Sequence, residues 1–232
     1  MTNLEREEVL RRWYTNHYNC LSAASNGSYA ERFLHRAMER PHGPASSFDR
    51  VLEVGANKGE HVQYVHHQFR EYLLTDISLP QVPAHLRADR RISVAACDAA
   101  NLPFRDREFD RVIATCLLHH VANPLRVFQE LCRVTRPGGI VTLMIPTDPS
   151  LAYRAGVWLT SRRAAKRAGL ETEMYLVKAL DHRNHYRSIA TQGMRALAGE
   201  DVSVEYLPFR FPSIELNAFT VWQVTRQPDA RR

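Results

Sequence analysis

The sequence predicts an α/β protein built on a doubly wound, mostly parallel β-sheet. Short segments rich in β-branched residues alternate with helical segments between residues 48 and 146, which is typical of strands joined by crossover helices. A glycine-bearing turn follows the first of these strands. With 232 residues, of which 44% are hydrophobic and 24% charged, the chain suits one large domain and not two full ones.

Local patterns place the elements along this fold. Helical spacing predicts an N-terminal helical extension within residues 1–45, with helices at 4–18 and 28–38. In the main domain, residues 46–232, we expect strands at 51–55, 71–78, 92–96, 110–118 and 140–146, and helices at 59–69 and 125–134. Residues 147–186 interrupt this alternation of strands and helices, and we interpret them as an inserted helical lid over a binding site. A helix at 188–197 and two strands at 202–209 and 217–226, close enough to pair antiparallel, end the chain.

Charge and cysteine content limit the class of protein. The net charge of +6 comes mainly from residues 151–200, which contain 9 Lys and Arg against 4 Asp and Glu. This local excess does not indicate a polyanion-binding surface over the whole protein, so we expect no nucleic-acid partner. The sequence shows no apolar segment of about 20 residues and no secretory pattern at its start. The four cysteines contain no CxxC pair, and we interpret them as reduced thiols. We therefore expect a cytoplasmic protein.

The turn after the first strand indicates a ligand that contains a nucleoside. It reads Glu53-Val-Gly55-Ala-Asn57-Lys-Gly59, and glycines there let a ligand approach the backbone closely. Asp76 ends the second strand, 21 positions after Gly55, where a carboxylate can accept the hydroxyl groups of a ribose. The G-x-G-x-x-G pattern of a nicotinamide site is not present in this turn.

Five consecutive motifs resemble those of the class I S-adenosylmethionine-dependent methyltransferases, in the group that includes the ubiquinone and menaquinone methyltransferases. They run from Val51 to Ile145 and read VLEVGANKG, LLTDIS, ACDAANLPF, DRVIATCLLHHV and RVTRPGGIVTLMIP. The resemblance implies a Rossmann-like sheet of seven strands with an antiparallel last strand, and S-adenosylmethionine as the cofactor. It places cofactor contacts at Glu53, Gly55, Ala56, Asn57, Gly59, Asp76, Ile77, Asp98, Ala99, Cys116 and Leu117.

The first loop departs from the family in one residue. Many members have a glycine at the position of Asn57. Asparagine tolerates the left-handed backbone better than other residues with a side chain. We therefore expect the loop to keep its shape.

Histidines near the fourth strand and in the insertion are the candidates for proton transfer. We favour His185 as the base, with His120, His182 and Tyr186 as alternatives, because DHRNHY would bring His182 and His185 onto one face of a helix. His119 and His120 also have a structural explanation, since resembling proteins often carry the same pair. A His-x-x-His pattern without a third ligand does not predict a metal, and none is expected.

The lid carries candidate acceptor contacts. Its arginines and lysine suggest an anionic acceptor, although such a charge cluster is most simply a solvated helix face. Candidate acceptor-binding residues are Tyr14, Tyr18, His119, Tyr153, Trp158 and Arg183.

We therefore expect a methyltransferase that acts on an oxygen or nitrogen of a small, anionic acceptor such as a sugar or natural-product intermediate. A lipid or quinone acceptor is the nearest alternative, because residues 152–170 combine Trp and Leu with Arg and Lys as in a membrane-surface helix. In that case we expect peripheral contact with a membrane and no integral association. A cofactor-binding subunit without catalysis is the third. A nucleic-acid methyltransferase is disfavoured, because TCLLHH replaces the Asn/Asp-Pro-Pro-aromatic signature after the fourth strand. Fold resemblance does not name the acceptor, and the oligomeric state stays open.

Overall fold

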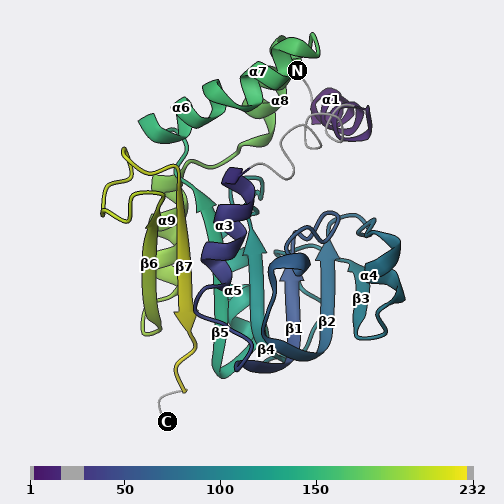
Figure 1. Cartoon of the computed structure of the whole chain (residues 1–232), viewed down its shortest axis with the longest axis vertical. Helices are drawn as coiled ribbons and strands as arrows, with labels where there is room; N and C mark the ends of the chain where they lie inside the picture. The colour runs from purple at the N-terminus through teal and green to yellow at the C-terminus, as the bar shows by residue number, and fades with distance from the viewer. Residues whose placement is uncertain (1–2, 17–28, 229–232) are drawn as a thin grey trace.

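The computed structural model describes residues 3–16 and 29–228, and its centre is one seven-stranded sheet (Figure 1). The strand order is β3-β2-β1-β4-β5-β7-β6. Strands β1 to β5 are parallel, whereas β7 runs antiparallel to both β5 and β6. The predicted fold class, with its antiparallel strand near one edge, is confirmed.

The strands and helices have the following bounds. The strands are β1 Ser47–Val54, β2 Gln68–Asp76, β3 Ile92–Ala96, β4 Phe109–Thr115, β5 Thr135–Pro146, β6 Asp201–Leu207 and β7 Phe219–Thr225. The helices are α1 Asn3–Asn16, α3 Tyr29–Glu39, α4 Ala84–Ala88, α5 Pro124–Val134, α6 Leu151–Leu159, α7 Ser161–Arg167, α8 Glu171–Asp181 and α9 Tyr186–Ala196. A single 3-10 turn, η1, spans Val62–Tyr64.

The helix predicted at 59–69 is wrong, because residues 59–67 form turns, η1 and irregular chain, and β2 begins at Gln68. His61, Tyr64 and His67 turn inward instead and are buried. The neighbouring sheet face is covered by α3, whose Leu34 and Met38 pack on the core that this face shares with β1 and β2. The N-terminal region therefore supplies a layer of the core that sequence reasoning had given to the crossover segment.

The opposite face of the sheet is covered by α5 and α9. Val127, Phe128 and Leu131 of α5 join Ile189 of α9 and Trp222 of β7 in the larger hydrophobic cluster. Asn123 accepts a hydrogen bond from the backbone N–H of Arg126 and Pro124 occupies the first turn, which explains why α5 begins there. Both helices lie behind the sheet in Figure 1.

Residues 147–186 form the predicted helical insertion, and α1 packs on it. Trp13 of α1 shares a small buried cluster with Ala165 of α7 and with Met174 and Val177 of α8. The Arg6 guanidinium also donates to the Leu180 carbonyl oxygen at 2.6 and 3.0 Å. Figure 1 shows α1, α6, α7 and α8 together beyond the upper end of the sheet.

One predicted helical feature of the insertion is also wrong. Residues 182–185 lie outside any helix, between the end of α8 and the start of α9. His182 and His185 therefore do not share a helix face. Within residues 3–16 and 29–228, we find no helix that is long and apolar enough to span a membrane.

Candidate active site

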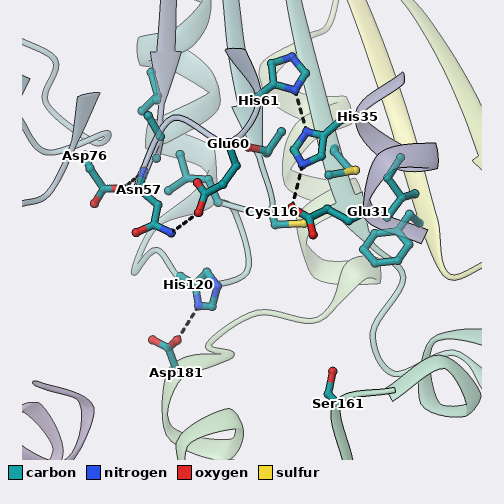
Figure 2. Close-up of a pocket in the computed structure, with 18 of the residues that line it drawn as sticks. Glu31, His35, Asn57, Glu60, His61, Asp76, Cys116, His120, Ser161 and Asp181 are labelled. Carbon is teal, nitrogen blue, oxygen red and sulfur yellow. Dashed lines mark hydrogen bonds and ion pairs between the residues drawn. The ribbon is translucent and has the colours of Figure 1, made fainter. Parts of the chain in front are cut away.

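An open cavity of about 2620 Å³ lies where the first four parallel strands end. Residues from the ends of β1, β2, β3 and β4 line one side of it, and residues of α3, α6 and α7 line the other (Figure 2). In open α/β sheets, ligands bind at this edge because the carboxyl ends of parallel strands converge there. The cavity is therefore the candidate active site.

The turn after β1 forms a backbone cradle. Gly55 has a φ of +77°, and a Cβ atom at this position would lie 3.0 Å from Leu117 Cδ1, so both conformation and space require glycine. Asn57 takes the left-handed conformation with a φ of 48°, as the sequence predicts. Its backbone N–H donates to Asp76 Oδ2 at 3.0 Å, which joins the first loop to the end of β2.

Glu53 lies at the base of this cradle, 1% exposed. Its carboxylate accepts a hydrogen bond of 2.7 Å from the Tyr72 hydroxyl. Burial raises the pKa of Glu53 to about 7, against the opposing influence of His61 and Tyr72. A cationic group placed here would keep the carboxylate ionised.

The ends of β2 and β3 supply two further carboxylates. Asp76 and Asp98 both line the cavity, together with Ile77 and Ala99. The Asp98 carboxylate accepts the N–H of Ala100 at 2.8 Å, which fixes the turn. Acids after three neighbouring strands, beside a glycine cradle, fit the amino, ribose and adenine groups of the cofactor that the resemblance implies.

The loop after β4 borders both the cradle and the space above it. Cys116 has a φ of 50° and lines the cavity with Leu117. Burial raises the pKa of the Cys116 thiol to about 12, so the thiol stays protonated and is not a nucleophile. His120 lines the cavity, and its Nδ1 lies 2.9 Å from Asp181 Oδ2, although the contact does not have the angle of a hydrogen bond (Figure 2).

A second group of histidines lies on the α3 side of the cavity. We call Glu39, Arg111, His61, His35 and His67 the arginine-centred cluster; all five are buried. Arg111 donates to both Glu39 carboxylate oxygens, at 2.6 and 2.7 Å. His61 Nε2 lies 2.8 Å from Glu39, and its Nδ1 lies 2.8 Å from Nδ1 of His35, which reaches the cavity wall (Figure 2).

Ionisation in this cluster follows from burial and from the permanent guanidinium. The hydrogen bonds from His61 and Arg111 overcome the effect of burial and hold the pKa of Glu39 far below its usual range. Burial, helped by His61, lowers the pKa of His35 to about 3. Burial and Arg111 lower the pKa of His67 to about 4. His35 and His67 are therefore neutral at physiological pH.

The lid supplies part of the predicted acceptor wall. Tyr153 lines the cavity, and burial raises the pKa of its phenol, which stays neutral. Arg163, Arg167 and Arg183 also line it. Trp158 does not: it is half exposed, with the Arg163 guanidinium 5.2 Å from its ring centre.

Several predicted site residues lie elsewhere. His185 is exposed at the start of α9 and does not line the cavity. Tyr186 is buried under α9, and His182 bonds through Nδ1 to Asp148 at 2.9 Å behind the cavity wall. His119 and Gly59 also lie outside the lining residues. Tyr14 lies in α1, but its side chain falls outside the described residues, as does all of Tyr18.

Sequence reasoning missed the residues that α3 brings to the cavity. Glu31 and His35 line it from this helix, and His61 and Glu60, from the segment after β1, line it as well, with His61 next to His35 (Figure 2). One signal was present: His35 and Glu39 are four apart, on the same helix face as apolar Leu34 and Met38, and polar residues on a buried face need partners.

Comparison with known proteins agrees with the fold. Residues 52–143 match the family model described as a methyltransferase domain. A demethylmenaquinone methyltransferase of Roseiflexus sp. is 31% identical over 56% of this chain and 58% of its own length. A tRNA (carboxymethyluridine(34)-5-O)-methyltransferase of Arabidopsis thaliana is 25% identical over 61% of this chain and 39% of its own. This chain thus spans well under two thirds of these curated relatives.

Solved structures show the same fold. Phosphoethanolamine N-methyltransferase 2 of Haemonchus contortus, in complex with S-adenosyl-L-methionine, aligns with a TM-score of 0.63 and 15% identity over 94% of this chain and 60% of its own. Residues 52–143 therefore match a methyltransferase domain, and the solved structure that shares the fold holds S-adenosyl-L-methionine. The resemblance seen in the five motifs is confirmed.

Proposed function

We propose that the protein transfers a methyl group from S-adenosylmethionine to an oxygen or nitrogen of a small, anionic acceptor such as a sugar or natural-product intermediate. The observation that carries this proposal is the continuity of the cavity, which runs from the carboxylates of the cofactor cradle to Arg163, Arg167 and Arg183. When bound, the cofactor supplies an electrophilic sulfonium methyl group. The chain binds and orients the acceptor, and excludes water.

Proton removal from a hydroxyl acceptor falls to His120 in this proposal. Of the four candidate residues, His120 alone lines the cavity, whereas the exposed position of His185 gives no geometric basis for the role first favoured for it. The Asp181 carboxylate lies 2.9 Å from Nδ1, and we assign the other ring nitrogen, Nε2, as the proton acceptor in this proposal.

Two binding experiments test the cofactor site. Asp76→Ala should weaken S-adenosylhomocysteine binding in calorimetry by about 1.5–3 kcal/mol, because charge-assisted hydrogen bonds to a ribose are lost. Asp89→Ala is the matched control, since Asp89 pairs only locally with Arg91 and does not line the cavity. Equal affinities of the two variants would remove the cofactor assignment.

The acceptor class is tested with arginines that differ in position. Mass spectrometry of co-purifying ligands would supply the acceptor for the assay. Arg163→Gln and Arg183→Gln should then raise its KM and leave S-adenosylhomocysteine affinity unchanged. Arg162→Gln and Arg187→Gln should change neither, because these side chains pair with Glu171 and Glu215 outside the cavity. Kinetics that are equal in all four variants and independent of salt would exclude an anionic acceptor.

A lipid or quinone acceptor at a membrane surface is the second candidate. Exposed apolar side chains favour it, and they come from α6 and from the loop between β6 and β7. They are Leu151, Trp158, Leu159, Phe209, Phe211 and Leu216. Co-sedimentation with anionic phospholipid vesicles that is lost in a Trp158→Ser/Leu159→Ser variant would support this alternative. Turnover with any acceptor would exclude a purely cofactor-binding subunit.

A further inference from the structure

Three histidine rings meet behind the cavity wall, and we call His119, His120 and His182 the three-histidine cluster. One ring nitrogen from each of them lies within 4.8 Å of the others. The ring centres are 3.8, 4.5 and 5.3 Å apart. The sequence showed two separate pairs, His119–His120 and His182–His185, and the fold brings His182 to the first pair and leaves His185 outside.

Carboxylates hold two of the three rings from outside. Asp148 Oδ2 lies 2.9 Å from Nδ1 of His182, and Asp181 Oδ2 lies 2.9 Å from Nδ1 of His120. Histidines that bind metals commonly have a carboxylate on the second ring nitrogen, which fixes the ring and makes it a better ligand. In His182 this hydrogen bond engages Nδ1 and directs ligation to Nε2, whereas the Asp181 carboxylate lies near His120 Nδ1 without the geometry of a hydrogen bond.

The third ring is buried with an unsatisfied nitrogen. His119 is 5% exposed, and its Nδ1 has no hydrogen-bond partner among the described residues. A buried polar atom without a partner is costly, and native structures normally satisfy it with protein, water or an ion. A cation between the three rings would satisfy this atom.

The backbone holds the two segments together before any ligand binds. The N–H groups of Arg183 and Asn184 donate to the His119 carbonyl oxygen at 2.8 and 3.2 Å. Asn184 Nδ2 donates to the Val121 carbonyl oxygen at 2.7 Å. The loop after β4 and the segment after α8 are therefore fixed against each other, and no folding step is needed to assemble the rings.

The charges around the cluster also permit a cation. Asp148 and Asp181 contribute two negative charges, and the Lys178 ammonium group, 3.6 Å from Asp148, contributes one positive charge.

We propose that His119, His120 and His182 bind a divalent transition-metal ion, with Asp148 and Asp181 as positioning residues. Three neutral imidazoles match zinc and its neighbours, whereas magnesium and calcium require oxygen ligands. Three protein ligands leave a fourth coordination position for water or for an acceptor atom.

Metal binding at the three-histidine cluster and the role of His120 as a base compete for the same nitrogen atom. His120 Nε2 cannot both ligate a cation and accept a proton from the acceptor. The loaded protein should therefore lose the base-dependent rate of the proposed methyl transfer. Metal binding itself does not depend on that function, so it is tested without any methyl acceptor.

The experiment is a zinc titration of protein freed of metal by a chelator, in competition with a chromophoric chelator. We expect one zinc per chain with a submicromolar Kd, and His182→Gln should weaken binding by 100-fold or more. His185→Gln is the matched control, because the residue has the same chemistry, is exposed and lies outside the cluster; its affinity should equal that of the wild type. Cobalt(II) in place of zinc should give a spectrum without thiolate charge-transfer bands.

A second variant separates a loss of zinc binding from a loss of the folded structure. Asp148→Asn keeps the three rings but weakens the orientation of His182, and it should reduce zinc affinity about 10- to 100-fold. Equal zinc affinity in the wild type, His182→Gln and Asp148→Asn would overturn the proposal. Absence of zinc binding to the wild type at about 10⁻⁴ M zinc would do so as well.

Discussion

The two histidine clusters beside the cavity differ in whether a cation is built into the chain. In the arginine-centred cluster, the Arg111 guanidinium forms two hydrogen bonds with Glu39, and the histidines extend this pair towards the cavity. In the three-histidine cluster, the carboxylates lie outside the rings, and His119 keeps an unsatisfied nitrogen. Similar residue types therefore have two outcomes. With the permanent Arg111 guanidinium they form a structural element, and with an unsatisfied ring nitrogen they form a candidate binding site for an added cation.

The largest difference should appear on removing one member of each cluster. Arg111→Met leaves the Glu39 carboxylate buried without its main partner, and the free energy of unfolding should fall by about 3–5 kcal/mol. His182→Gln in metal-free protein should lower it by only about 1 kcal/mol, because a single hydrogen bond at a partly buried site is lost. Urea denaturation of both variants measures the difference. Equal losses of unfolding free energy would show that the two clusters stabilise the fold to the same extent.

Acid should destabilise the protein through the buried neutral histidines. The pKa values of His35, His42 and His67 are lowered to about 3, 4 and 4, mainly by burial, while the unfolded chain binds these protons near pH 6.5. Between pH 6.5 and 4 the unfolded state therefore holds more protons, so stability is complete above pH 6.5 and falls as the pH is lowered. We expect a loss of at least about 3 kcal/mol between pH 7 and 5 in urea denaturation.

The depressed pKa of Glu39 contributes in a different window. Its stabilisation is present above the ordinary pKa of a glutamate, 4.5, and is lost only below that value. A stability curve that is flat from pH 7 to 5 would therefore contradict the assignment of neutral histidines and would leave that of Glu39 untouched.

Zinc should stabilise the folded protein through only one of the clusters. At a free zinc concentration of 100 times Kd, the wild type should gain about 2.7 kcal/mol, seen as a rise in Tm. His182→Gln should lose this gain, whereas His67→Gln, in the arginine-centred cluster, should keep it. A gain that disappears in His67→Gln and persists in His182→Gln would reverse the assignment of the two clusters.

The smallest effect concerns Glu53, next to the arginine-centred cluster. Its pKa of about 7 means that it is partly protonated at neutral pH, and a bound cationic ligand should lower that pKa. S-adenosylmethionine should therefore bind about tenfold more tightly at pH 8 than at pH 6, or about 1.4 kcal/mol, with release of a proton. Calorimetry in two buffers of different ionisation enthalpy measures the release. Glu53→Gln should abolish both effects.

The order of sequence patterns predicts the parallel sheet and the edge of that sheet at which the candidate cofactor site lies. Strand periodicity and turn residues are local signals, and the ends of neighbouring parallel strands meet at one edge in any doubly wound sheet. The turn and its spacing predict that Gly55 and Asp76 lie together, the family resemblance adds Asp98, and all three line the cavity. The same reasoning failed for residues 59–69, because His61 and His67 are drawn inward by Glu39, a partner from α3.

Only the tertiary structure decided which histidines meet. His182 is next to His119 and His120 because the segment after α8 hydrogen-bonds to the loop after β4, whereas His185 is exposed at the N-cap position of α9. His35 reaches the cavity because α3 packs on the sheet face that the missing crossover helix would have covered. Periodicity sets which face of an element is buried, but the neighbour that it meets depends on packing between segments far apart in the chain.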